Sequence, residues 1–157
     1  MSSQLQSHPL AIAILLNSYK SPHIHTIRDS YTRTLHSVDP TLSLTFFYPA
    51  DHPFTPLPDP SLFDLIIIGG GNADPRKTHP WILRVHAFIL ETIATYPLKK
   101  MVGICWGHQT ISLLFGAEIV DMATPEANGC SPVKPSGSSN ITVVPSAVST
   151  PAASPRW

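Results

Sequence analysis

The chain has 157 residues, enough for one domain with a hydrophobic core that needs no disulfides. Ten lysines and arginines balance ten aspartates and glutamates, so the charge favours neither nucleic acid nor an anionic membrane as a partner. The two cysteines, Cys105 and Cys130, match neither a disulfide framework nor the ligand spacing of a zinc site, which favours a reducing, cytoplasmic setting.

The first elements follow a strand, helix, strand pattern. Residues 10–16, "LAIAILL", form a short continuous apolar run that predicts a strand buried on both faces. The run is too short to cross a membrane, and no Lys or Arg precedes it as in a signal peptide. Residues 42–48, "LSLTFFY", predict a second strand. Between them, a helix is predicted at residues 23–38, with apolar side chains three and four positions apart: Ile24, Ile27, Tyr31 and Leu35.

The central segment continues this alternation after a proline-rich surface loop at residues 49–63. Residues 64–71, "DLIIIGGG", predict a third strand that ends in glycines. The pattern at residues 79–97 is typical of an amphipathic helix with a proline near its first turn. Residues 99–105, "KKMVGIC", predict a fourth strand.

A further helix is predicted at residues 107–116 and a short fifth strand at residues 117–120. Since strands alternate with helices, we expect an α/β fold with a parallel sheet and helices on both faces. Residues 10–133 would form the domain, after a disordered N-terminus at residues 1–9. Residues 134–157 are rich in Ser, Pro, Thr and Ala and predict a disordered tail.

The stretch "GICWG" around Cys105 carries the strongest chemical signal. A strand that turns sharply into a helix lifts one side chain clear of the sheet, and small flanking residues are needed because the backbone is crowded there. Gly103 and Gly107 stand two residues before and two residues after the cysteine. The thiol would then lie at a helix N-terminus, where the helix dipole favours a nucleophilic thiolate.

The glycines that end the third predicted strand fit the same site. Ligand sites in open α/β sheets lie at the carboxyl ends of the strands, so this loop should face Cys105. Backbone N–H groups of Gly70 and Gly71, with the N–H of Trp106, could form an oxyanion hole. Glycine suits this loop because a substrate must approach the backbone closely.

These residues also allow other interpretations. A cysteine after an apolar strand is more often inert packing, and the two flanking glycines argue against that here. We expect the ring of His108 to face the protein, so it is not taken as the general base. His23 and His25 have no neighbouring Cys or acid and are expected to be solvated. Neither a metal nor a cofactor is expected.

The segment "GICWGHQ" (residues 103–109) resembles the nucleophile signature of class I, triad-type glutamine amidotransferases. "LIIIGGG" (residues 65–71) is similar to the oxyanion loop of that family, and "LFGAEIV" (residues 114–120) continues in the same manner. Weaker similarity lies in "PEANG" (residues 125–129) and "SPVK" (residues 131–134). The resemblance covers residues 10–134, and stand-alone γ-glutamyl peptidase-like members are the most similar in character. It implies a flavodoxin-like sheet that is incomplete at its C-terminal side.

The resemblance also implies a chemistry. Cys105 would attack the γ-amide of glutamine or a γ-glutamyl peptide, forming a glutamyl thioester that water hydrolyses. The oxyanion would be held by N–H groups at Gly70, Gly71 and Trp106, and Gln109 would contact the glutamyl part of the substrate. The His108-Gln109 pair is the amidotransferase form of this turn, which disfavours other cysteine proteins of similar fold.

One part of the family pattern is missing. The triad needs a histidine and an acid on later strands, but none of the eight histidines follows His108. An impaired enzyme, active if a partner chain supplies these groups, is therefore one hypothesis. A non-catalytic truncated paralogue or binding subunit is the other hypothesis. The resemblance would attach it to a specialised-metabolite pathway, as for other stand-alone members of the family, but the sequence selects no particular one. We also expect an uncovered sheet edge and an apolar flank, which predict poor solubility or a need for a partner protein.

Overall fold

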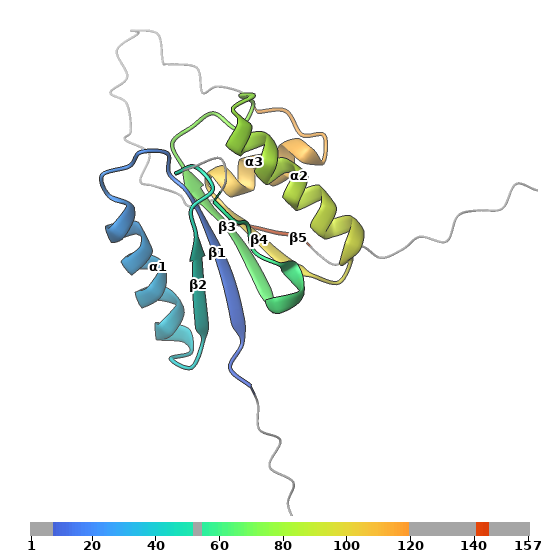
Figure 1. Ribbon diagram of the computed structural model, residues 1–157. Helices are drawn as coiled ribbons and strands as arrows, with labels where there is room; N and C mark the ends of the chain where they lie inside the picture. The colour runs from blue at the N-terminus through green and yellow to red at the C-terminus, as the bar shows by residue number, and fades with distance from the viewer. Residues whose placement is uncertain (1–7, 52–54, 120–140, 145–157) are drawn as a thin grey trace, which may run out of the picture.

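The computed structural model describes residues 8–51, 55–119 and 141–144 (Figure 1). Every strand and helix predicted up to residue 114 is present, with ends within two residues of the predicted ones. In chain order the elements are β1 (Ala11–Asn17), α1 (Ile24–Val38), β2 (Ser43–Phe47), the short 3₁₀ helix η1 (Pro60–Leu62), β3 (Leu65–Gly71), α2 (Pro80–Thr95), β4 (Lys100–Ile104), α3 (Trp106–Leu114) and β5 (Ile141–Val144).

The strands form one sheet in the order β2-β1-β3-β4-β5. β1 to β4 run parallel, and β5 pairs antiparallel with β4, with Gly103 opposite Thr142. The chain moves to one side of β1 to make β2 and to the other side to make β3. The carboxyl ends of β1 and β3 therefore flank the crevice where α/β sheets of this kind bind ligands. The predicted α/β, flavodoxin-like fold is confirmed.

The core has two halves because alternate side chains of the strands point to opposite faces of the sheet. On one face, strand residues such as Ile14 and Ile67 pack against the apolar side of α1. On the other face, Leu15 and Ile68 pack against α2 and α3. Figure 1 shows the same division, with α1 apart from the pair formed by α2 and α3. Helices thus cover both faces, as the continuous apolar runs of the strands predicted.

Two expectations about the end of the chain need correction. Residues 117–119 are not a strand. β5 instead lies within residues 134–157, which were predicted to be disordered from their Ser and Pro content. The four-residue run "ITVV" is β-branched throughout, a strong local preference for strand that the composition of the whole segment concealed. The edge of β4 is therefore paired rather than exposed.

Some expectations fall on residues that the structure does not describe. Residues 1–7, Cys130 and the segments at residues 125–129 and 131–134 lie outside the described ranges. Within those ranges, no helix has both the length and the apolar character required to cross a membrane.

Candidate active site

Cys105 alone forms the turn between β4 and α3. Its backbone has φ 53° and ψ −109°. A positive φ is unusual for a residue with a side chain, and Lys20 is the other non-glycine residue with one in the described ranges. Such strained turns are characteristic of nucleophiles presented between a strand and a helix. The sharp turn predicted from the sequence is present.

The flanking glycines are required by close backbone contacts. A Cβ atom on Gly107 would lie 1.9 Å from the carbonyl oxygen of Ile68 in β3, and one on Gly103 would lie 2.6 Å from the carbonyl oxygen of Gly107. Real Cβ atoms do not approach other atoms this closely. The first turn of α3 can therefore pack directly on β3 only because both positions lack a side chain.

The glycine loop at the end of β3 lies beside the cysteine. A Cβ atom on Gly70 would be 3.7 Å from the Cβ of Cys105, an ordinary van der Waals distance. A Cβ atom on Gly71 would be 3.1 Å from Cγ of Trp106 and 2.7 Å from the carbonyl oxygen of Asn17. The loop and the turn predicted to form one site are thus adjacent, although they are more than thirty residues apart in the sequence.

The thiol of Cys105 is free and exposed, so it is not an inert core cysteine. Trp106 is the first residue of α3, and backbone N–H groups in the first turn of a helix have no acceptor within that helix. The carbonyl oxygen of Cys105 accepts a 3.0 Å hydrogen bond from the N–H of Gln109, which fixes the turn to the helix. Cys105 therefore stands at the N-terminus of α3, where backbone donors are available to an anion.

Two side chains that the sequence did not identify as part of the site hold the glycine loop. The buried Asn17 amide, at the end of β1, donates hydrogen bonds to the carbonyl oxygens of Leu15 (3.2 Å) and Gly69 (3.1 Å). From α1, the hydroxyl of Tyr31 accepts a 3.4 Å hydrogen bond from the N–H of Gly70. Asn17 could have been noticed as a polar residue ending an apolar strand, but nothing in the sequence distinguishes Tyr31 from its apolar helix neighbours.

The family of the chain follows from a comparison with protein-family models. Residues 26–150 match the model described as glutamine amidotransferase class-I. The match covers most of the chain and includes the turn, the glycine loop and β5. The chain belongs to the class-I glutamine amidotransferases.

Relatives agree with this assignment. The glutamine amidotransferase-like protein chyE of Penicillium rubens is 30% identical over 112 residues, which are 70% of this chain and 46% of that protein. The glutamine-hydrolyzing GMP synthase subunit of Ignicoccus hospitalis is 27% identical over 116 residues, 73% of this chain and 53% of its own length. The carbamoyl phosphate synthase small chain of Methanosarcina acetivorans is 39% identical over 71 residues, 45% of this chain and 17% of its own length. The matches to the first two relatives thus span about half of each.

The remaining residues considered in the sequence analysis lie in α3, in α1 or at the N-cap of α1. Gln109 is exposed one turn after Cys105. His108 is half-buried, and its Nδ1 atom is buried with no hydrogen-bond partner in the described part of the chain. No histidine in that part forms a hydrogen bond with the Cys105 side chain. His23 and His25 are exposed, and the described residues contain no cluster of ligands suited to a metal ion.

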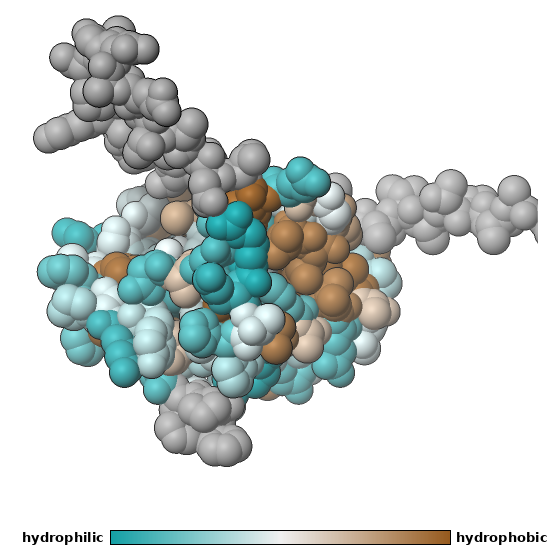
Figure 2. All heavy atoms as spheres, turned by 90° about the horizontal axis from the view of Figure 1, so that it is seen from above, coloured by the Kyte–Doolittle hydropathy of each residue, from teal (hydrophilic) through white to brown (hydrophobic). Residues whose placement is uncertain are grey.

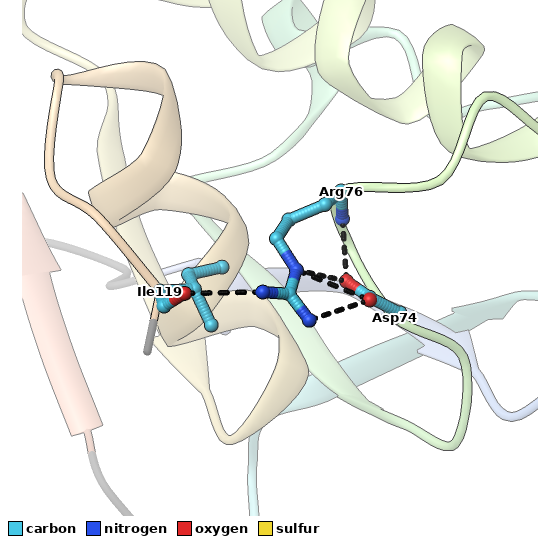
Figure 3. A network of polar contacts seen from close by, with 3 residues as sticks. All are labelled: Asp74, Arg76 and Ile119. Atoms are coloured by element: carbon cyan, nitrogen blue, oxygen red, sulfur yellow. Dashed lines mark hydrogen bonds and ion pairs between the residues drawn. The ribbon is translucent and has the colours of Figure 1, made fainter. Parts of the chain in front are cut away.

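A polar network connects the loop after β3 with the segment after α3 (Figure 3). The Arg76 guanidinium makes several contacts with the Asp74 carboxylate, the shortest at 2.8 Å, and donates a 3.2 Å hydrogen bond to the carbonyl oxygen of Ile119. The Arg76 side chain and the Arg76 N–H both hold the pKa of Asp74 at about 2. Arg76 thus connects the loop that follows the glycines of β3 with the segment that follows α3, the helix that begins after Cys105.

The end of the molecule that carries the site has an uneven surface. Seen from the carboxyl ends of β1 to β4, hydrophobic side chains gather on the side of α2 and α3, and most of the remaining surface is hydrophilic (Figure 2). The exposed hydrophobic residues here include Leu83 and Leu90 of α2 and Phe115, which directly follows α3. The expected apolar flank is present.

A pocket of about 280 Å³, lined in part by Asp51, His79 and Trp81, does not include Cys105.

Proposed function

We propose that the chain acts on the γ-amide of glutamine or of a γ-glutamyl compound, with Cys105 as the nucleophile. The observation that carries this proposal is the strained turn at Cys105, which presents a free, exposed thiol next to Gly70. Membership in the glutamine amidotransferase class-I family supports glutamine as the substrate class. Gln109 is proposed to contact the glutamyl part of the substrate, from one turn along the same helix.

The reaction begins with the Cys105 thiolate. Its sulfur forms a bond to the γ-carbonyl carbon while the π pair of the carbonyl moves to oxygen. The oxyanion then reforms the carbonyl as the carbon–nitrogen bond breaks, and the leaving nitrogen takes a proton to depart as ammonia or an amine. Water attacks the resulting glutamyl thioester, and glutamate and the thiolate are released. Backbone N–H groups of Gly71 and Trp106 are proposed to stabilise the oxyanion.

Proton transfer is the weak step of this scheme. Residues 109–157 contain no histidine, so this stretch of the chain supplies no triad base. Without such a base, solvent water must protonate the leaving nitrogen, and activity should fall several orders of magnitude below that of a complete triad. We therefore propose slow catalysis by this chain alone.

We propose a partner protein as a source of the triad base. Two of the relatives are named as parts of larger enzymes, one as a small chain and one as a subunit, so related domains are found in assemblies. We propose that this chain likewise works beside another protein, which contacts the apolar flank that includes Leu83 and Phe115. A glutamine-binding subunit without catalysis is the second candidate, favoured by the lack of a histidine after His108.

A substrate with a weakly basic leaving group separates these candidates. With γ-glutamyl p-nitroanilide, the leaving amine depends much less on protonation, so the first step should proceed without a triad acid. The proposal predicts a burst of about one p-nitroaniline per protein, followed by slow turnover. Cys105→Ala should give no burst. A wild-type protein that releases p-nitroaniline no faster than Cys105→Ala would exclude catalysis and leave the binding role.

A further inference from the structure

The hydroxyl of Tyr31 lies at the candidate site although Tyr31 belongs to α1, on the far face of the sheet from α3. The ring packs in the cluster that α1 forms with β1 and β3, and the hydroxyl reaches the glycine loop. Its oxygen is 3.4 Å from the Gly70 nitrogen and 3.0 Å from where a Cβ on Gly69 would lie. Because a Cβ atom on Gly70 would lie 3.7 Å from the Cβ of Cys105, Gly70 is a neighbour of both the hydroxyl and the nucleophile.

The direction of this hydrogen bond leaves the tyrosine proton available. Gly70 donates its N–H, so the Tyr31 oxygen is the acceptor and its own O–H can donate to another group. In the described part of the chain, that O–H has no acceptor. An O–H group that has no acceptor, at the edge of a reaction site, can donate a hydrogen bond to an oxygen atom of the substrate.

The tyrosine keeps this proton under physiological conditions. Burial raises the pKa of the Tyr31 hydroxyl, the Gly70 N–H lowers it, and the charge of Cys105 raises it further. The hydroxyl is therefore neutral near pH 7.

We propose that the Tyr31 hydroxyl donates a hydrogen bond to the oxyanion that forms when Cys105 attacks the substrate carbonyl. The inference rests on the proposed function. The Gly70 N–H, which the sequence assigned to the oxyanion, is already bonded to the tyrosine oxygen. Tyr31 takes over that role through its own O–H. The hydrogen bond from the Gly70 N–H polarises the hydroxyl and makes it a stronger donor. The proton stays on Tyr31 throughout, so no bond is made or broken at the tyrosine.

A packing role alone does not require this hydroxyl. The neighbours of Tyr31 on the same side of α1 are Ile24, Ile27 and Leu35, and a phenylalanine at residue 31 would keep the ring contacts. Tyr31→Phe therefore removes the donor and preserves the packed shape. Tyr48→Phe is the matched control, because Tyr48 packs against the same cluster but follows β2, two strands away from β3.

The test compares two alkylating reagents on purified protein, following Cys105 by peptide mass spectrometry. The chloroketone analogue of L-glutamine carries a carbonyl oxygen that enters the oxyanion site, whereas iodoacetamide reacts with the thiol without needing that site. The proposal predicts that Tyr31→Phe slows the chloroketone reaction at least about tenfold and leaves the iodoacetamide rate unchanged. Tyr48→Phe should change neither rate.

Each other outcome has a definite meaning. Equal chloroketone rates for wild type and Tyr31→Phe would overturn the role of Tyr31 while leaving the proposed function intact. A parallel fall in both rates would show that Tyr31 only maintains the structure around Cys105, which also overturns the proposal. A wild-type Cys105 that reacts with iodoacetamide but no faster with the chloroketone than a simple thiol does would refute the proposed function itself.

Discussion

At the scale of single residues, Cys105 combines an exposed thiol with a backbone conformation that is costly for any residue with a side chain. Positive φ at a non-glycine position typically costs about 1–3 kcal/mol, and such strain is retained where the surrounding structure enforces it. Here β4 before the turn and α3 after it are packed and paired, so the cysteine cannot relax. The backbone strain thus lowers the free energy of unfolding at the residue that is proposed to react.

This strain predicts a stabilising substitution at the site. Cys105→Gly should raise the free energy of unfolding by about 1 kcal/mol, because glycine adopts positive φ without a steric penalty. Denaturant unfolding of the two proteins measures the difference. Cys105→Ala, which removes the thiol but keeps a Cβ, is the control and should not be stabilised. A Cys105→Gly protein that is less stable than the Cys105→Ala protein would show that the turn carries no strain.

The titration of Tyr31 gives a second prediction at this scale. Since its pKa is raised in the folded protein, the neutral hydroxyl contributes stability below the ordinary tyrosine pKa of about 10, and that contribution is lost as the pH rises through the raised value. In an ultraviolet phenolate titration, Tyr31 should give a component above the ordinary tyrosine pKa. That component should be absent in Tyr31→Phe; its persistence would mean that another tyrosine produces it.

At the scale of elements, the contact between α3 and β3 decides the shape of the site. Gly107 allows the helix to lie directly on the backbone of Ile68, so any side chain there must push the helix away. The same displacement would move Cys105 relative to Gly70. The position of the nucleophile therefore depends on the absence of one methyl group.

The corresponding test uses two glycines. Gly107→Ala should destabilise the protein by about 3 kcal/mol or more, because a Cβ at 1.9 Å from the Ile68 oxygen cannot be accommodated without moving α3. Gly116→Ala is the control: it has φ 87° and no atom within 4 Å of the added Cβ, so only the backbone strain of about 1 kcal/mol applies. Comparable losses for both substitutions in thermal or urea unfolding would refute this account of the packing.

The loop after β3 gives a further prediction for an element. Arg76→Ala removes the side-chain contacts that hold the Asp74 pKa at about 2, so the value should rise toward 3.8. The depressed pKa stabilises the fold above the ordinary value and this contribution is lost as the pH falls toward 2. Carboxyl NMR titration measures the change. Lys77→Ala is the comparison, because the Lys77 charge makes the smallest of the contributions that lower the Asp74 pKa, so its effect should be smaller. An unchanged Asp74 pKa in Arg76→Ala would show that the ion pair does not form in solution.

For the elements up to residue 114, apolar periodicity and turn residues were sufficient to predict which segments are strands and which are helices. The pattern of β1 and of α1 predicted their type and their buried sides because local preference and burial point to the same structure. For β5, local preference and overall composition disagreed, and the pairing with β4 favours the strand. Tyr31 could not be predicted as part of the site: its spacing indicates a packed helix face, and only the three-dimensional structure brings its hydroxyl to Gly70.

At the scale of the whole molecule, the sheet order places the ends of β1, β3 and β4 side by side, so that Asn17, the glycine loop and Cys105 meet. This arrangement depends on the topology rather than on any one residue. It explains how segments far apart in the sequence make one site. The apolar flank over α2 and α3 lies at the same end of the molecule, where a partner could both cover it and approach Cys105.

The central claim is that Cys105 stands inside a site for the glutamyl group, and protection from alkylation tests it most directly. Iodoacetamide labelling of Cys105 is followed by peptide mass spectrometry, which separates it from Cys130, in the presence of L-glutamine or L-asparagine. The account predicts that glutamine slows the labelling of Cys105 in a saturable manner and that asparagine, one methylene shorter, protects far less. Labelling at the same rate with glutamine, with asparagine and with neither would contradict it.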